Sequence, residues 1–583
     1  MLFKSTNTWH RNQDLNLVLF LGQKFDELFF DYTLDTYKPP ALNPSFICRE
    51  ALSLINEIES ETIDRNNLSY VLEELEWALR NDIVAKEMLT LDIDNFILKD
   101  ENLRLGDVRL RLEVLERVLN PLAYFELCRE MLVEKVSTSG SKKEISHLAT
   151  LLASLLINIG ISKQHIYEKA KEFFFSEKEL TSVEDLNVFF ESISPTHHHF
   201  EIFFLVSNEI LMIKDAMKVF DIKVITELPN NLKVLAREQN LKKKKEELWV
   251  QVESIETYDR HTARRSAEAR LEMVSDLFSL YAHKGKIKWR YDAIITQCCE
   301  DIDRIIKKAK SPMDKCVDEK PRVASKKLDF FLKNISLNRD AIRRFNRVVD
   351  LHSTALESDL PENQLINIWI AIETIVPSTV HGGGKVKKIC NALEPILLKK
   401  YVNRLLINLI KDLIKWGRSK LTNILKKVDN YENKKIDQLV LELIALDRYN
   451  DLRQDLYRKL DNFHLLRYRV FEMAELFRKP KNVIDRIALH EKKVRWQLRR
   501  IYRTRNLIVH SGNSLPYIDT LIENSHDYLD QTMNSVVEYS CGTLDAKTLE
   551  QVFEMAKLDY DFFSKELNKI EKFDENNLSI FLI

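Results

Sequence analysis

The sequence predicts a mainly α-helical protein of several domains, and two observations support that prediction. The chain has 583 residues, enough for more than one hydrophobic core, but only 11 glycines and 13 prolines. Because these two residues break helices most strongly, their scarcity favours long helices joined by short connections. Apolar residues also recur at intervals of three and four along much of the chain, which is typical of amphipathic helices.

Composition and charge limit the class of protein. The chain is 45% hydrophobic and 30% charged with a net charge of −1, so affinity for nucleic acid has to come from local patches. Seven cysteines include no CxxC pair, which argues against both a disulfide framework and a zinc site. The longest mostly apolar run, 148–161, is too short to cross a bilayer, and no N-terminal signal is visible. We therefore expect a cytoplasmic protein that needs no cofactor.

The chain divides into three predicted regions. Residues 1–195 are predicted as a helical N-terminal region, with amphipathic segments at 69–89 and 103–119, and are expected to sense or regulate because no catalytic motif occurs there. Residues 196–325 are predicted as a small mixed α/β module. Its expected elements are three strands and a helix, at 200–206, 222–225, 248–255 and 258–283.

Residues 326–583 are predicted as an α-helical bundle. Its most informative part is a basic helix, in which 486–505 holds six arginines and two lysines against one acid. Arg505 stands where the apolar series of this helix calls for an apolar residue, and a guanidinium is costly to bury without an anion. Gly512 is expected to end the helix, so that His510 falls in its last turn. Together with Asn506, these side chains suggest a phosphate-handling site. The apolar series is Val494, Leu498, Ile501 and Ile508.

A second constellation lies upstream, in 365–376. Ile366, Trp369 and Ile370 form an apolar stripe, and Glu373 occupies its next position. A carboxylate and a guanidinium, each on a core-facing stripe of one bundle, are expected to meet or to line one polar cleft. The alternative interpretation is a purely structural buried ion pair.

The spacing of the three candidate residues sets a geometric condition. Asn506 and His510 are four apart and share one helix face, whereas Arg505 and His510 lie about 140° apart around an ideal helix. They can act together if the helix loosens near Gly512, if the long arginine reaches round, or if a second copy of the helix completes the site.

These residues resemble a known family. Arg-Asn-x-x-x-His at the end of a basic bundle helix resembles the R-x4-6-H motif of HEPN-domain ribonucleases. The upstream IWIAIET, followed by the glycine-rich loop 381–384, is similar to the Apea-like branch, which is often found in bacterial anti-phage and toxin systems. The resemblance covers about 326–583. It implies a site built from two HEPN copies, hence a homodimer or higher oligomer, and a 2′,3′-cyclic phosphate product.

The leading hypothesis is a metal-independent endoribonuclease that acts as a toxic effector in defence. His510 suits acid or base chemistry near neutral pH, and Arg505 offers donors to phosphate oxygens. Asn506 would orient His510, and Glu373 would fix Arg505. RNA is the expected partner, with a separate regulatory or sensor protein left open. The arginines expected to follow the RNA backbone are Arg495, Arg499, Arg500 and Arg503, although a solvated helix face explains each of them about as well.

A non-catalytic HEPN scaffold that dimerises or binds RNA is the main alternative, because a fold does not fix a function. A nucleotidyl-transfer enzyme would need acidic metal ligands that the sequence does not display. His197, His198 and His199 suggest a metal, but no acidic or cysteine partner lies at ligand spacing, which favours a loop.

Overall fold

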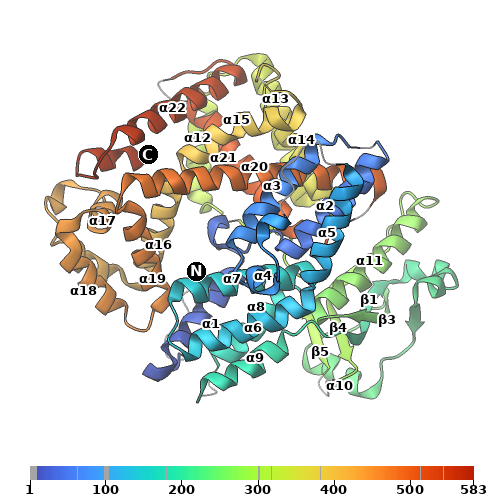
Figure 1. Cartoon of the computed structure of the whole chain (residues 1–583). Helices are drawn as coiled ribbons and strands as arrows, with labels where there is room; N and C mark the ends of the chain where they lie inside the picture. The colour runs from blue at the N-terminus through green and yellow to red at the C-terminus, as the bar shows by residue number, and fades with distance from the viewer. Residues whose placement is uncertain are drawn as a thin grey trace. The chain divides into compact units, whose positions relative to one another are not determined.

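The computed structural model describes residues 9–61, 63–96, 104–176, 180–299, 303–316, 318–380, 382–512, 514–541 and 544–582. Within these ranges the chain is mainly helical with one small sheet, which confirms the predicted fold class (Figure 1). His381 of the predicted glycine-rich loop lies outside the described residues. None of the helices in the described ranges combines the length and the apolar composition required to span a bilayer.

The chain forms two compact units, which differ from the three predicted regions. The larger unit comprises 1–152, 174–183 and 311–583, and the smaller comprises 153–173 and 184–310. The N-terminal helices therefore share a unit with the C-terminal bundle. Two parts of the predicted N-terminal region, 153–173 and 184–195, belong instead with the sheet.

The larger unit is built from helices at both ends of the chain. Its N-terminal helices are α1 (Asn16–Phe29), α2 (Pro44–Glu59), α3 (Asn66–Asn81), α4 (Ile83–Met88), α5 (Leu105–Val118), α6 (Pro121–Ser137) and the first part of α7 (Lys142–Ile159). The segment predicted as one helix at 69–89 is broken between α3 and α4. The break lies at Asp82, whose carboxylate accepts a hydrogen bond from the Ala85 amide at 2.8 Å as an N-cap.

The C-terminal part of this unit begins with a 3₁₀ turn, η8 (Pro312–Asp314). Its helices are α12 (Pro321–Asn334), α13 (Arg339–Glu357), α14 (Pro361–Ile375), α15 (Lys385–Lys399), α16 (Tyr401–Leu425), α17 (Ile436–Ala445), α18 (Asn450–Leu460), α19 (His464–Phe477), α20 (Pro480–Ser511), α21 (Ile518–Cys541) and α22 (Leu549–Lys569). The prediction that this region is α-helical is confirmed.

Helix α20, drawn in orange in Figure 1, runs through the larger unit and touches helices from both ends of the chain. It packs against α14, α15, α16, α19, α21 and α22 and also against α3. Trp77 of α3 and Trp496 of α20 bring their rings to 5.6 Å. A buried ion pair between Arg469 of α19 and Glu27 of α1 joins the two parts again. These contacts explain why the N-terminal helices do not form a unit of their own.

The smaller unit centres on an antiparallel sheet in the order β2-β3-β1-β4-β5. The strands are β1 (His198–Ser207), β2 (Ile222–Ile225), β3 (Glu247–Thr257), β4 (Trp289–Gln297) and β5 (Arg304–Lys307). The first three confirm the predicted strands, and β4 and β5 were missed. The unit also holds α8 (Lys163–Phe174), α9 (Leu186–Ser192), α10 (Asn230–Glu238) and α11 (Arg260–Ser279).

The central strand β1 is buried on both faces, which explains its nearly continuous apolar sequence. Phe204 and its even-numbered neighbours pack into one core with Ala267 and Leu271 of α11. Phe203 and Leu205 pack into the other core with residues of α10. Because successive side chains of a strand point to opposite faces, the apolar residues of β1 are shared between the core beside α11 and the core beside α10.

Candidate functional site

Helix α20 ends as its sequence predicts. Gly512 has φ +68°, in the left-handed region that favours glycine, and its amide donates to the Ile508 carbonyl at 2.9 Å. The helix is continuous from Pro480 to Ser511, so His510 lies in the last turn. The imidazole of His510 is exposed.

Arg505 is half-buried on an otherwise apolar stripe, as predicted. Its Nη1 donates to Asn506 Oδ1 at 3.0 Å, and its Nε is buried without a hydrogen-bond partner. No acidic side chain within the described ranges forms an ion pair with it. Because no ion pair with a carboxylate has to be broken first, the Arg505 guanidinium can donate directly to an incoming anion. The buried members of the stripe are Val494, Leu498, Ile501 and Ile508.

Arg505 and His510 do not meet within one chain. The helix between them is regular, so their side chains keep the angular separation of about 140° that five residues produce. Arg505 accordingly turns toward the stripe, while His510 faces solvent. Loosening of the helix end, the first of the expected remedies, does not occur.

Glu373 does not fix Arg505 in the described structure. Its Oε2 lies 2.8 Å from Lys385 Nζ at the start of α15, and Trp369 Nε1 donates to its Oε1 at 2.5 Å. The expectation fails because the buried face of α14 runs through Ile368, Trp369 and Ile372, one position away from the predicted stripe. Glu373 lies at the edge of that face, where the ammonium group of Lys385 reaches it.

Glu373 still lies near α20 through an aromatic contact. The Trp369 ring, which donates to Glu373, is 5.6 Å from the ring of Tyr502. Tyr502 precedes Arg505 by one turn. Glu373 is thus a candidate for positioning α14 against α20.

Three of the four arginines expected to follow RNA are buried. Arg499, Arg500 and Arg503 are 8%, 1% and 7% exposed. The Arg499 guanidinium lies 3.0 Å from the centre of the Tyr70 ring, a cation–π contact. Arg495 is the more exposed member, at 43% of its side chain, but it pairs with Glu394 and Glu491.

Arg500 and Arg503 are neutralised by acids from helices that precede them by more than 400 residues. Arg500 Nη2 lies 2.9 Å from Glu50 Oε2 and 2.6 Å from Glu74 Oε2, and Arg503 Nη2 lies 2.7 Å from Glu50 Oε1. Burial alone would raise the pKa of Glu50, but the two guanidinium groups lower it to about 2. Burial raises the pKa of Glu74, which shares a single arginine. The basic run is therefore an internal ion-pair network rather than a backbone-tracking surface.

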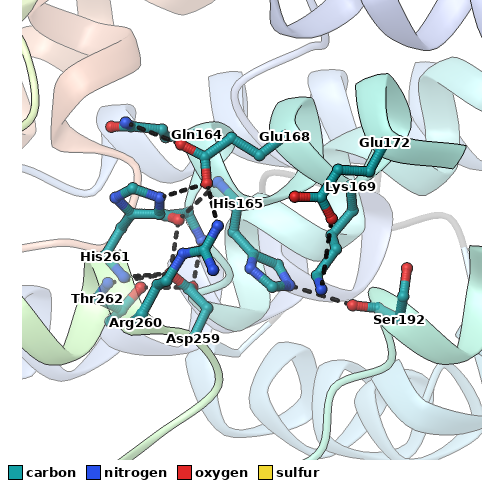
Figure 2. Close-up of polar contacts among 11 residues, drawn as sticks. Gln164, His165, Glu168, Lys169, Glu172, Ser192, Asp259, Arg260, His261 and Thr262 are labelled. Carbon is teal, nitrogen blue, oxygen red and sulfur yellow. Dashed lines mark hydrogen bonds and ion pairs between the residues drawn. The ribbon is translucent and has the colours of Figure 1, made fainter. Parts of the chain in front are cut away.

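A second polar cluster lies in the smaller unit, between α8 and α11 (Figure 2). Glu168 accepts from Arg260 Nη2 at 2.6 Å and approaches His261 Nε2 at 2.9 Å. Burial would raise the pKa of Glu168, but its hydrogen bond to His261 and the charge of Arg260 lower it to about 2. Asp259 caps α11 and accepts the Ser162 hydroxyl at 2.7 Å.

This second cluster is not arranged for nucleophilic catalysis. The Ser162 hydroxyl donates to a carboxylate that also accepts three backbone amides, and no imidazole of the described residues lies between them to take its proton. Ser162 Oγ also accepts the His165 amide at 3.1 Å and so caps the start of α8. The cluster therefore joins two helix N-termini.

The prediction that the histidines at 197–199 form a loop without partners is wrong. His198 and His199 begin β1, and His198 Nδ1 lies 3.0 Å from Cys299 Sγ. His197 Nδ1 lies 3.4 Å from Glu256 Oε1. These partners are absent from the local sequence because the sheet brings them from β3 and from the turn after β4.

The structure also forms a third polar cluster, which no pattern in the sequence predicts. His352 of α13 and His526 of α21 approach with their Nε2 atoms 2.9 Å apart, and Asp530 lies one turn after His526. Within the described ranges these three residues are the group whose spacing suits a metal ion. The two histidines are 174 residues apart, so no local motif signals them. The i,i+4 pair of His526 and Asp530 is the only trace in the sequence.

No family model matches the sequence, and searches of curated proteins and of solved structures find no match either.

Proposed function

We propose that this protein is a metal-independent endoribonuclease of the HEPN type, with its site at the C-terminal end of α20. The observation that carries the proposal is the state of Arg505: a half-buried guanidinium with a partnerless Nε, beside Asn506 and one turn or so before an exposed His510. Arg495, Arg500 and Arg503 pair with carboxylates and Arg499 is buried against an aromatic ring, whereas Arg505 is only half-buried and has no acidic partner in the described ranges. It is thus the cation best prepared to receive a phosphate.

The proposed reaction is an internal transesterification of RNA. The 2′ oxygen forms a bond to phosphorus while the bond from phosphorus to the 5′ oxygen breaks, which leaves a 2′,3′-cyclic phosphate and a free 5′ hydroxyl. His510 takes the proton of the 2′ hydroxyl or gives one to the 5′ oxygen, a role worth ~10²–10⁴-fold in rate. Arg505 stabilises the charge that develops on the phosphate oxygens. DNA lacks the 2′ hydroxyl and is not a substrate.

The site requires two copies of the chain. Arg505 and His510 point to different sides of a regular helix end, so the proposal places Arg505 of one copy opposite His510 of another. Asn506 and His510 share one face and would both lie at this junction. Glu373 is proposed to position α14 against α20 rather than to touch the phosphate.

The contacts also favour one alternative, a non-catalytic HEPN scaffold that dimerises or binds RNA. The observation behind it is that three of the four expected RNA-contacting arginines are buried in the larger unit. Under the ribonuclease proposal, RNA is held chiefly at the reacting phosphate. Under the alternative, the end of α20 serves assembly alone.

Incubation of the purified full chain with total RNA, with and without EDTA, separates the two. Cleavage that persists in EDTA and leaves 2′,3′-cyclic phosphate ends supports the ribonuclease. His510→Ala should lower the rate by ~10²-fold or more, whereas Val509→Ala, a change of the neighbouring exposed side chain, should leave it within twofold. A His510→Ala protein that cuts RNA at the wild-type rate would refute the proposal.

A cellular test addresses the proposed role as a toxic effector in bacterial defence. Overexpression of the wild-type chain should stop growth, and Arg505→Ala should relieve that toxicity while the protein accumulates in folded form. Toxicity that survives both Arg505→Ala and His510→Ala would point to the scaffold instead.

A further inference from the structure

The third cluster has the geometry of a metal site. His352 Nε2 lies 2.9 Å from His526 Nε2 and 3.8 Å from Asp530 Oδ1, and His526 Nε2 lies 3.6 Å from Asp530 Oδ2. Asp530 offers a different oxygen to each histidine, and all three separations are shorter than the ~4 Å that two ligand atoms span when each lies ~2.0–2.2 Å from one zinc ion.

The three ligand atoms are held by rigid elements. His352 lies in α13, and His526 and Asp530 lie one turn apart in α21, so one ion would join two helices of the same unit. His526 is 5% exposed at its side chain and His352 21%, whereas Asp530 is 41% exposed. Two fixed imidazoles thus form the inner wall of the site, and the carboxylate forms its solvent side.

The local charges lack a cation. Asp530 lies near the two histidines, and within the described ranges no lysine or arginine forms an ion pair with it. Asp318, which follows η8, adds a second negative charge close enough to act on His526. A divalent cation would balance both carboxylates and would replace the hydrogen bond that joins the two imidazole nitrogens.

We propose that His352, His526 and Asp530 bind a divalent transition-metal ion of the zinc class. Two imidazole nitrogens and one carboxylate oxygen suit Zn²⁺ and its neighbours, while Mg²⁺ and Ca²⁺ prefer oxygen ligands alone. Three protein ligands leave a fourth coordination position, on the side where Asp530 meets solvent.

This site is independent of the proposed ribonuclease, whose groups are Arg505, Asn506 and His510. RNA cleavage is expected to resist EDTA, whereas occupancy of the metal site is expected to be removed by it. Failure to bind zinc would therefore not contradict the ribonuclease proposal, and failure to cleave RNA would not contradict the metal site.

The test is equilibrium binding of ZnCl₂ to the EDTA-treated, dialysed full chain, with MgCl₂ as the comparison. We expect one Zn²⁺ per chain, little Mg²⁺ binding and a zinc-dependent rise in the thermal midpoint. His352→Gln and Asp530→Asn, which keep the side-chain volume, should each weaken zinc binding at least tenfold. Substitution by Co²⁺ should produce the visible absorption of a low-coordinate nitrogen and oxygen site.

The matched control is His283→Ala, which removes an exposed histidine of the smaller unit and should bind Zn²⁺ like the wild type. Thermal midpoints measured in EDTA show whether each variant is folded. The proposal is overturned if the wild-type chain binds less than one zinc ion per chain at micromolar concentrations. It is overturned equally if folded His352→Gln and His526→Gln proteins bind zinc as tightly as His283→Ala does.

Discussion

Mixing an Arg505→Ala protein with a His510→Ala protein should restore RNA cleavage that neither protein shows alone. The reason is the geometry of α20, which is regular up to Ser511 and turns Arg505 and His510 to different sides. Five residues of an α-helix correspond to a rotation of about 140° and a rise of about 7.5 Å. One phosphate can hardly receive both side chains of the same helix end, but it can receive one from each of two copies.

The size of the effect follows from twofold symmetry. A symmetric dimer has two equivalent sites, each with Arg505 from one copy and His510 from the other. When the two variants exchange subunits freely, about half of the dimers contain one copy of each, and one site of such a dimer keeps both groups. The mixture should therefore cut RNA at about a quarter of the wild-type rate.

The assay follows cleavage of a labelled RNA after the two proteins, carrying different affinity tags, have been incubated together. Co-purification of both tags establishes that mixed dimers have formed. The control mixes wild-type protein with the double variant Arg505→Ala/His510→Ala, whose mixed dimers contain no site with both groups. If mixed dimers of the single variants form and remain as inactive as their parents, while the wild type is active, the two-copy site is refuted.

Three further predictions concern stability. Arg500→Ala removes the cation that Glu50 and Glu74, each 12% exposed at the side chain, share. Glu74 then loses its arginine and Glu50 keeps Arg503, so the free energy of unfolding in urea should fall by ~3–5 kcal/mol; a loss below ~1 kcal/mol would contradict the network. The pKa of Glu168 is lowered from 4.5 to about 2, so its contribution is complete above pH 4.5 and disappears as the pH falls through 2. Glu168→Gln should therefore lower the thermal midpoint at pH 6 but not near pH 2, and an equal effect at both would oppose this. Gly512→Ala should cost about 1 kcal/mol and Gly512→Asn less, because only the backbone angle, and no neighbouring atom, opposes a side chain.

Much of the fold was predictable because it follows from local periodicity. The first three strands and the helices of the C-terminal bundle were found from apolar spacing, and the end of α20 from Gly512. The break at Asp82 was missed because the apolar spacing continues across it. The hydrogen bond by which the Asp82 side chain caps α4 is a local alternative to a continuous helix, and the spacing does not reveal it. The short strand β5 has too few residues to show an alternation.

The division into units was not predictable from the same signals, because it follows from contacts between residues that lie far apart in the sequence. Glu50 and Glu74 look like ordinary surface acids of amphipathic helices, and Arg500 and Arg503 look like a basic surface. Only the packed structure shows that they neutralise one another. Local patterns also gave no sign of the His352–His526 pair. They predicted a contact between Glu373 and Arg505, because the apolar stripe around each residue was expected to face the core.

The burial of the basic run changes how RNA binding should respond to salt. Each phosphate neutralised by a free cation contributes about −0.7 to the slope of log affinity against log salt for single strands. Had Arg495, Arg499, Arg500, Arg503 and Arg505 all contacted RNA, the slope would be about −3.5. Because Arg499, Arg500 and Arg503 are buried and Arg495 is paired with two acids, Arg505 alone predicts about −0.7 per site, or about −1.4 if Arg495 exchanges its partners. Fluorescence anisotropy of a short labelled RNA bound to His510→Ala protein across a salt series measures this slope. A value near −3.5 would mean that the buried arginines become accessible to RNA, and it would contradict the internal network as the state that binds.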